Sequence, residues 1–143
     1  MTTQLPPQKF RELTLQFLFS QDVHASDPHE LCEFLMRELK VSRKHVQEAC
    51  IKVEMILAAR TQIDAAITEI STSYALDRIQ SVERAILRLA VFELLVEKSI
   101  PHQIIIAEAK RLAKKFSTPD AVIFCQALLD ALVKKHEICN QEA

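Results

Sequence analysis

The side chains most able to do chemistry are four cysteines and five histidines, and their spacing argues against a reactive centre. The cysteines form no Cys-X-X-Cys pair, and no histidine stands at the spacing of a zinc site. His45 near Cys50 and His102 near Glu108 match no nucleophile–base pattern. We therefore expect no catalytic residue, no metal and no cofactor, and we expect the protein to act by binding. The cysteines are Cys32, Cys50, Cys125 and Cys139.

The sequence contains no glycine. Glycine supplies positive-φ turns and the loops that cradle phosphates, so sheet-rich folds become improbable. The glycine-rich phosphate loop, the dinucleotide fingerprint and the nucleophile elbow are all excluded. The formal charge is -1, from 18 basic and 19 acidic residues. Any nucleic-acid contact must therefore come from a local patch.

Length and composition favour one cytoplasmic domain. The 143 residues, of which 49% are hydrophobic, suit a single domain over residues 1–143. Residues 1–11 hold no apolar signal core, so we expect the cysteines to stay reduced. The densest apolar run, residues 104–107, is far shorter than the ~20 residues that cross a bilayer. We expect a protein without a membrane span.

Apolar residues at helical spacing predict two amphipathic helices before residue 40. Pro6-Pro7 can open the first, because proline at the first helical position loses only an amide that had no partner. Asp27-Pro28 gives the second a cap and a proline in its first turn. The expected buried stripes are Phe10, Leu13, Phe17 and Leu18 in the first helix, and Leu31, Phe34, Leu35 and Leu39 in the second.

A long apolar periodicity follows from Ser42, an expected cap, to Ile70. No proline or glycine interrupts it, although Arg60 and the Thr61-Gln62 pair could mark a kink. One long helix and two shorter helices therefore both stay open. After a turn around Tyr74, which we expect to pack between the two halves, residues 82–96 are apolar on more than one face and predict a central buried helix.

Two proline signals define the last helices. Ile100-Pro101 opens a helix over residues 101–116, and Thr118-Pro119 starts the final one, which reaches about residue 135. The predicted fold is all-α, a bundle of six or seven helices in two packed sub-bundles. The N-terminal helices cover about residues 7–72 and the C-terminal helices about 76–136.

Three stretches of this sequence together resemble the NusB family. The first stretch, in the first helix, is Arg11-Glu12, Leu15-Gln16 and Leu18-Phe19. The second and most specific is the block of Asp77-Arg78-Ile79, residues 82–90 (VERAILRLA) and Glu93-Leu94. The third is Ile100-Pro101 with residues 104–116. With Phe124 and Leu129-Asp130 near the end, the resemblance covers residue 9 to about residue 134. It implies a NusB-like helical bundle.

The resemblance also implies a function. Family members are RNA-binding transcription antitermination factors that pair with the small-subunit ribosomal protein NusE. They recognise the boxA element of nascent ribosomal transcripts, as part of the RNA polymerase antitermination complex. The same domain occurs fused to an RNA methyltransferase, but the length of this chain favours the stand-alone factor.

The resemblance places candidate RNA-binding residues at two positions. Lys9 and Arg11 stand at the start of the first helix, where relatives are arginine-rich; ordinary helix-start charge is the equal alternative. Asp120, Phe124 and Gln126 stand at the start of the last helix. An exposed phenylalanine there could stack on an unpaired base, whereas a buried one would belong to the core.

The same resemblance places Glu83 at the interface with the ribosomal protein, with Arg84 and Arg88 on a neighbouring face. Internal ion pairs with Glu93 or Asp77 are the alternative for the two arginines. Lysines and arginines at 110, 111, 114 and 115 form a basic stripe that can track phosphates, although such a stripe is more often a solvated face.

A second function remains open, because residues 122–127 (VIFCQA) depart from the family's pattern and lose a cation, an asparagine and a glycine. The chain could be a helical protein-interaction module of the same fold with weakened or lost RNA binding. Apolar positions on the first helix could serve a homodimer, the heterodimer or the core. DNA binding by a helix-turn-helix is disfavoured, since no helix begins with several exposed polar residues.

Overall fold

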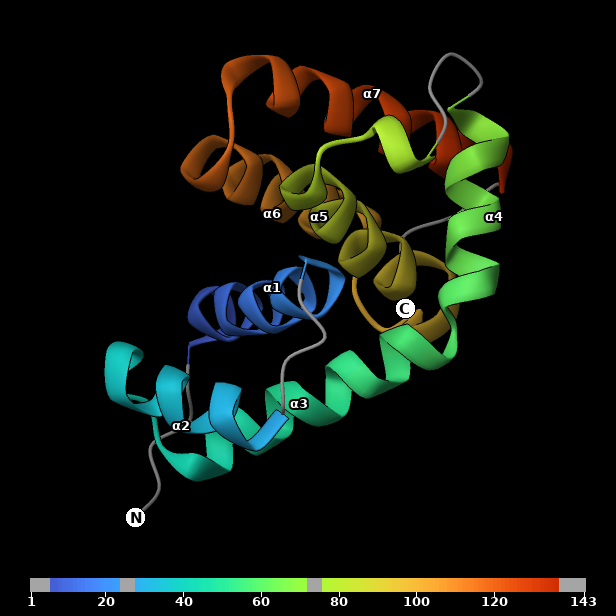
Figure 1. The fold of residues 1–143 in the computed structure, drawn as a ribbon. Helices are drawn as coiled ribbons and strands as arrows, with labels where there is room; N and C mark the ends of the chain where they lie inside the picture. The colour runs from blue at the N-terminus through green and yellow to red at the C-terminus, as the bar shows by residue number, and fades with distance from the viewer. Residues whose placement is uncertain (1–5, 24–27, 72–75, 137–143) are drawn as a thin grey trace. The chain divides into compact units, whose positions relative to one another are not determined.

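The computed structural model describes residues 6–23, 28–71 and 76–136 (Figure 1). Within these residues nearly the whole chain is helical and no strand occurs, so the predicted all-α fold is confirmed. Asp27 and Tyr74 lie outside the described residues. None of the described helices is both long and apolar enough to cross a membrane. The elements are α1 (Pro7–Val23), α2 (Pro28–Leu39), α3 (Arg43–Ala58), α4 (Arg60–Ile70), the short η1 (Leu76–Arg78), α5 (Ser81–Phe92), the π-helical η2 (Glu93–Glu97), α6 (His102–Phe116) and α7 (Pro119–Lys135).

The chain divides into two compact units, Met1–Leu57 and Ala58–Ala143. The division falls where α3 gives way to α4, within the apolar periodicity that left one or two helices open. Ala59 interrupts the helix with φ -95° and ψ 10°. Arg60 follows at a point where an apolar residue would continue the stripe, and it is exposed. Of the two alternatives left open, two shorter helices with a break next to Arg60 is the one found.

Unit 1 contains α1, α2 and α3. Ser42 caps α3 by accepting a hydrogen bond from the backbone N–H of His45 at 3.3 Å, as the sequence predicts. The Lys52 ammonium lies 5.9 Å from the centre of the Phe10 ring, which links α3 to α1. The core residues on these helices are Leu13, Leu15, Phe17, Leu18, Leu35, Val46, Ala49, Val53 and Ile56.

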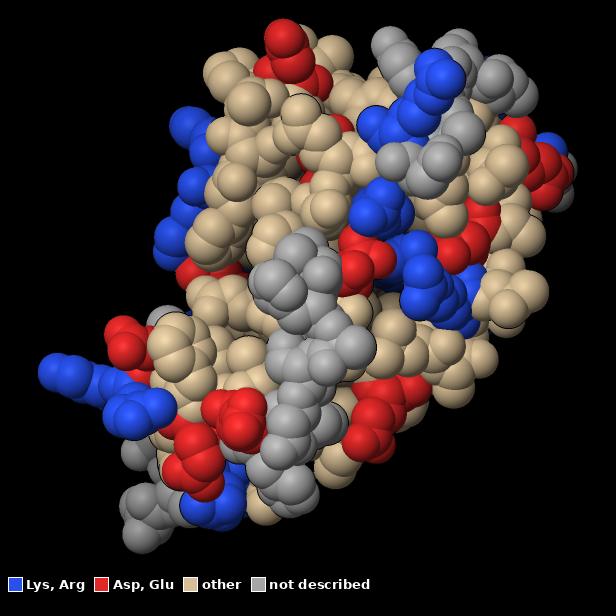
Figure 2. All heavy atoms as spheres, in the orientation of Figure 1, with Lys and Arg blue, Asp and Glu red and all other residues tan. Residues whose placement is uncertain are grey.

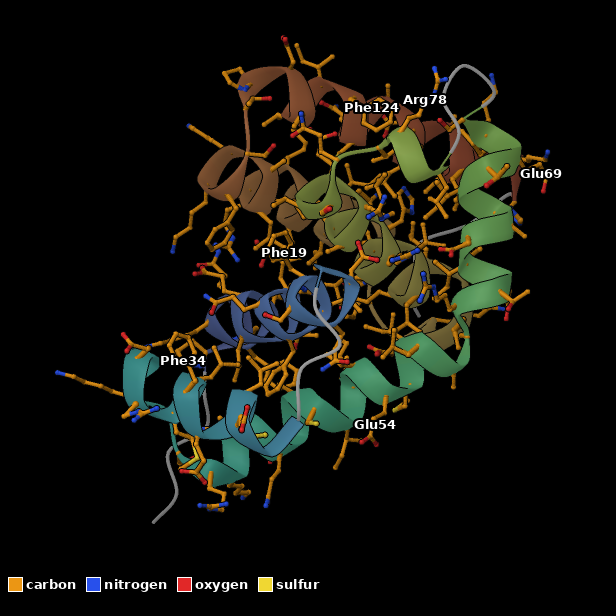
Figure 3. All side chains as sticks on the ribbon, in the orientation of Figure 1. Phe19, Phe34, Glu54, Glu69, Arg78 and Phe124 are labelled. Atoms are coloured by element: carbon orange, nitrogen blue, oxygen red, sulfur yellow. The ribbon has the colours of Figure 1, made fainter. Side chains whose placement is uncertain are left out.

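Phe34, one residue of the predicted α2 stripe, is exposed, and Leu31 is half-buried. Leu35 is only 3% exposed, whereas Phe34 is 49% exposed (Figure 3). Successive helical residues point about 100° apart, so the face that buries Leu35 turns Phe34 toward solvent. The prediction that Phe34 is buried was therefore wrong.

Unit 2 is built around α5, which packs against α4, α6 and α7. Every residue from Ala85 to Leu94 is buried, and this explains why the sequence is apolar on more than one face there. The helix continues as η2 and ends at Lys98, whose backbone is left-handed with φ 56°. In α7, Thr118 is the cap and Pro119 lies in the first turn, as the sequence predicts.

Candidate nucleic-acid interface

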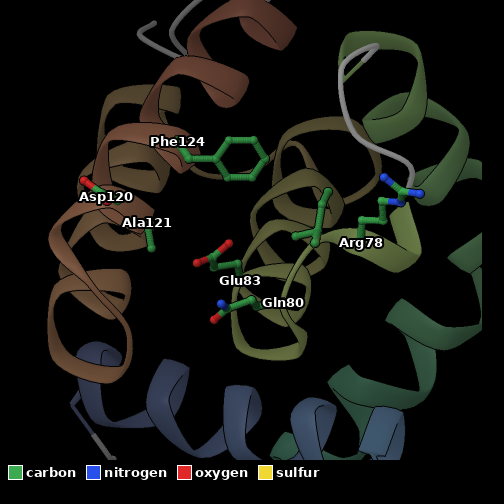
Figure 4. A pocket seen from close by; sticks show the side chains of 7 residues that line it. Arg78, Gln80, Glu83, Asp120, Ala121 and Phe124 are labelled. Atoms are coloured by element: carbon green, nitrogen blue, oxygen red, sulfur yellow. The ribbon is translucent and has the colours of Figure 1, made fainter.

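A surface groove of about 260 Å³ lies in unit 2, between the η1–α5 segment and the first turns of α7 (Figure 4). It brings together three residues that the sequence selected for separate reasons: Asp120 and Phe124 as RNA-binding residues, and Glu83 as a partner-binding residue. The groove is lined by Arg78, Ile79, Gln80, Glu83, Asp120, Ala121 and Phe124.

The α7 wall of the groove is set by the start of that helix. The Thr118 hydroxyl oxygen accepts a hydrogen bond from the backbone N–H of Ala121 at 3.1 Å, which fixes the first turn. Asp120 lies in this turn and Phe124 lies four residues later, on the same face. Asp120 is exposed. Its carboxylate also complements the positive end of the helix dipole, so it has a structural as well as a binding role.

The opposite wall is held by Arg84 of α5. Its guanidinium donates hydrogen bonds to the backbone carbonyl oxygens of Leu76 and Ile79, at 3.3 and 3.1 Å. These bonds tie η1 to the first turn of α5. The exposed residues Arg78 and Gln80 are thereby presented at the edge of the groove. Arg84 acts here as a positioning residue.

Glu83 joins the groove to the α6–α7 turn. Its carboxylate accepts a hydrogen bond from the Ser117 hydroxyl at 3.4 Å. Nearby, burial and, to a smaller extent, the negative charge of Glu83 together raise the pKa of Cys125 to about 12. The Cys125 thiol is therefore neutral at physiological pH and is a poor nucleophile.

Phe124 is half-buried, so it is neither a core residue nor a fully exposed one. Figure 4 shows its ring reaching from α7 across the groove towards the η1 wall that carries Arg78. A ring held in this way keeps area available to a planar ligand. Stacking of the Phe124 ring on an unpaired base therefore remains a prediction, and this geometry allows it.

The charges of the groove suit a base better than a phosphate. One guanidinium, Arg78, stands with two carboxylates, Glu83 and Asp120. Carboxylates repel the phosphate backbone, but they accept hydrogen bonds from the amino groups of bases. Together with an aromatic ring and the Gln80 amide, they form the donor and acceptor set that reads an unpaired base.

The remaining RNA-binding candidates lie elsewhere. Gln126 is half-buried on α7 and does not line the groove, because it lies two residues past Phe124 on another side of the helix. Lys9 and Arg11 belong to unit 1. Lys9 is exposed, whereas Arg11 is only 8% exposed, which limits the charge that it can offer to a ligand.

Arg88, a candidate partner-binding residue, is 3% exposed. Its Nε and Nη2 donate to the two carboxylate oxygens of Asp64 in α4, at 2.9 and 3.0 Å. Arg88 therefore makes an internal ion pair, as the alternative interpretation allowed, but its acceptor is Asp64, which the sequence did not indicate. The interface roles of Glu83, Arg84 and Arg88 stay predictions.

Sequence reasoning missed two residues of the groove, Arg78 and Gln80. Arg78 belongs to the block that carries the most specific part of the resemblance, and Gln80 lies in the gap within that block, directly after Ile79. That position was the available signal. What the sequence does not show is that this block lies across from α7.

The described residues thus form an all-helical protein with a base-sized surface groove and no cluster of three or more His, Cys, Asp or Glu side chains that could hold a metal ion. Residues 8–134 match the model of the NusB family, and the chain belongs to this family.

Curated relatives support this assignment across most of the chain. The chain is 37% identical over 130 residues to the transcription antitermination protein NusB of Chlamydia pneumoniae, covering 91% of this chain and 81% of that protein. It is 36% identical over 126 residues to the protein of the same name in Geobacter sulfurreducens, covering 85% and 89%.

Solved structures show the same fold. NusB of T. maritima superposes with a TM-score of 0.77 at 28% identity, over 93% of this chain and 94% of that one. A chain from a crystal structure of the antitermination factors NusB and NusE in complex with dsRNA superposes with a TM-score of 0.77 at 26% identity, over 90% and 96%.

Proposed function

We propose that this chain is an RNA-binding transcription antitermination factor that pairs with a NusE-type ribosomal protein and binds boxA-type RNA within the RNA polymerase antitermination complex. Relatives named transcription antitermination proteins support the first part. The structural relative solved with NusE and dsRNA supports the second. The family match runs through both units, which supports one NusB-like domain over residues 1–143. The chain works by binding and not by catalysis.

The groove is the observation that carries this proposal. Sequence-specific RNA recognition commonly targets unpaired bases, which stack on aromatic side chains and hydrogen-bond along their edges. Phe124 supplies the stacking surface, and Glu83 and Asp120 supply acceptors for amino groups. Arg78 supplies the one cation, which can bind a base edge or the adjoining phosphate.

The test measures the affinity of Phe124→Ala for fluorescently labelled boxA RNA, with and without NusE. Loss of one stacked base costs ~1–3 kcal/mol, so the dissociation constant should rise roughly 5- to 150-fold. Phe34→Ala is the matched control, since Phe34 is the same residue type and 49% exposed, on a helix of unit 1. It should bind as the wild type does.

Two results would contradict the proposal. Equal affinities of Phe124→Ala and the wild type for boxA RNA would show that the groove does not take part in RNA recognition. Equal binding of boxA and scrambled RNA by the wild-type protein with NusE would remove sequence-specific RNA binding from the proposed function altogether.

The second function, a protein-interaction module with weak RNA binding, is favoured by exposed apolar side chains on unit 1. Phe34, Ile51 and Met55 are each about half exposed, at 49%, 57% and 50%. A salt series separates the two functions. RNA binding weakens steeply as salt rises, whereas an apolar protein interface does not.

The predicted interface role of Glu83 has its own test. Glu83→Gln keeps the shape of the side chain and removes its charge. It should weaken binding of NusE if the carboxylate meets a cation of that protein. Asp130→Asn, an exposed carboxylate of α7 outside the groove, is the control.

A further inference from the structure

The groove leaves one requirement of RNA binding unmet. It holds two carboxylates and one guanidinium, so it repels the phosphates that flank a bound base. Affinity for RNA depends largely on cations that neutralise phosphates. If the proposed function holds, and the inference rests on it, such cations must lie close to the groove.

The exposed face of α6 provides them. The helix buries Ile105, Ala109 and Leu112 on one side. On the other side the half-buried Lys110 and the exposed Lys114 lie four residues apart, and the exposed Lys115 follows. Figure 2 shows Lys and Arg atoms gathered along the edge of the molecule where α6 ends.

The α6 helix itself adds no exposed carboxylate to this face. The one acidic residue of α6, Glu108, is buried and accepts hydrogen bonds from the Arg111 guanidinium at 2.9 and 3.3 Å. Its charge is compensated by that arginine. Among the described residues, no carboxylate forms an ion pair with Lys110 or Lys114. These two ammonium groups are available to an anionic ligand.

Complementing the helix dipole does not account for the whole stripe. Lys114 and Lys115 are in the last turn of α6, where cations are favourable. Lys110 is more than one turn earlier, beyond the reach of that effect. The end of α7 offers a comparison, because Lys135 there is paired with the Glu69 carboxylate. Lys135 thus has an ion-pair partner on α4, whereas no carboxylate of the described residues pairs with Lys110 or Lys114.

The stripe also adjoins the groove. The Lys115 ammonium lies 5.5 Å from the centre of the Phe116 ring, which is 36% exposed. The next residue, Ser117, donates its hydroxyl to Glu83 in the groove. The cationic face of α6 and the base-binding groove are thus joined by the short α6–α7 turn.

We propose that Lys110, Lys114 and Lys115 form a second RNA-binding surface, which holds the phosphate backbone next to the base bound in the groove. The surface contributes affinity that does not depend on base sequence, and the groove contributes the discrimination. Phe116 extends the aromatic area at the junction of the two.

The experiment compares two triple variants that lose the same charge. The stripe variant is Lys110→Gln, Lys114→Gln and Lys115→Gln. The control variant is Lys40→Gln, Lys44→Gln and Lys134→Gln, at three exposed lysines outside α6. Binding of boxA and scrambled single-stranded RNA is measured with NusE present, over a series of salt concentrations. Circular dichroism and NusE binding verify that both variants fold.

Each phosphate contact contributes about 0.7 to the slope of log K against log salt for a single strand. The stripe variant should therefore lose about 2 from this slope, which is a roughly 40-fold loss of affinity at 0.15 M salt if the two lines meet at 1 M. Both RNAs should weaken equally. The control variant should keep the wild-type slope within about 0.5.

A stripe variant with the wild-type slope would overturn the inference and leave the proposed function standing. A stripe variant that loses NusE and keeps RNA would also overturn it, since the stripe would then bind an acidic protein surface. Absence of salt-dependent RNA binding by the wild-type protein would overturn both.

Discussion

Two arginine–carboxylate pairs, one in each unit, have nearly the same shortest N–O distance and opposite surroundings. Arg88 and Asp64 in unit 2 approach to 2.9 Å, with side chains 4% and 20% exposed. Arg43 and Glu33 in unit 1 approach to 3.0 Å, with side chains 61% and 58% exposed. Water screens the second pair and not the first. The exposure of the two side chains to water, and not the distance between them, therefore sets how much such a pair contributes to the free energy of unfolding.

The cysteines of the two units also differ in how far they are buried. Burial, the largest cause, raises the pKa of Cys32 and of Cys50 in unit 1, and both thiols remain half-buried. Cys125 in unit 2 is fully buried, with its pKa raised to about 12. The thiol of unit 2 is therefore closed off from solvent, whereas the two described thiols of unit 1 remain partly within its reach.

The largest effect is expected from Arg88→Ala. It removes two hydrogen bonds from the Asp64 carboxylate, which is 20% exposed and keeps the longer 3.5 Å contact to Arg60. Breaking a fully buried pair costs about 3–5 kcal/mol, so we expect a loss towards the lower end of that range. Urea denaturation monitored by circular dichroism measures the change in the free energy of unfolding.

Arg43→Ala is the matched control for this prediction, because an exposed pair contributes about 0–1 kcal/mol. The double variant Arg88→Met with Asp64→Leu should recover much of the loss, since it removes both charges together. Equal losses for Arg88→Ala and Arg43→Ala would contradict the comparison on which the prediction rests.

The next largest effect concerns the thiols. A shift from the ordinary pKa of 9.0 to about 12 lowers the thiolate fraction of Cys125 by about a thousandfold. In native protein at pH 8, a maleimide pulse followed by peptide mass spectrometry should label Cys32 and Cys50 well before Cys125. Cys125 is fully buried, so it should react only when unit 2 opens. Labelling of all three at one rate would show that unit 2 opens as easily as unit 1.

Local signals explain why much of the fold was predictable. Thr118 and Pro119 start α7 where the sequence places them, because a cap and a first-turn proline act within one turn. The buried helix α5 follows from its composition in the same way. The exposure of Phe34 and the burial of Arg11 were not predictable, since both depend on what packs against the helix.

The residues of the candidate site also divide into those that the sequence indicates and those that depend on tertiary packing. Asp120 and Phe124 could be selected on one helix from the resemblance. That Arg78 lies across from them, and that Asp64 receives Arg88 from 24 residues away, depends on tertiary packing that periodicity does not encode.

A smaller effect is expected at the backbone. Lys98 ends η2 in the left-handed region with φ 56°, and in unit 1 Lys40 has φ 52°. A side chain with a Cβ atom costs ~1–2 kcal/mol in that region, and glycine avoids most of this cost at some loss of chain entropy. Lys98→Gly should therefore raise the free energy of unfolding by about 1 kcal/mol, measured by urea denaturation. Lys98→Ala keeps the Cβ atom and should give no gain. An equal gain from Lys98→Ala would show that loss of the lysine charge, and not relief of the left-handed backbone, raises the free energy of unfolding.

The smallest effect is expected from Glu69→Gln, which removes an exposed ion pair within unit 2 itself. The hydrogen bond and then the charge of Lys135 hold the pKa of Glu69 below its usual value (Figure 3 shows Glu69 on α4). A lowered carboxyl pKa stabilises the fold above the unfolded-state pKa, and this contribution disappears as the pH falls through the native value. The difference between wild type and Glu69→Gln in thermal denaturation should thus be present at neutral pH and vanish in acid. Both side chains are about half exposed, so the difference should stay far below that of Arg88→Ala. A loss as large as that of Arg88→Ala would mean that membership of unit 2, and not exposure to water, sets the strength of its ion pairs.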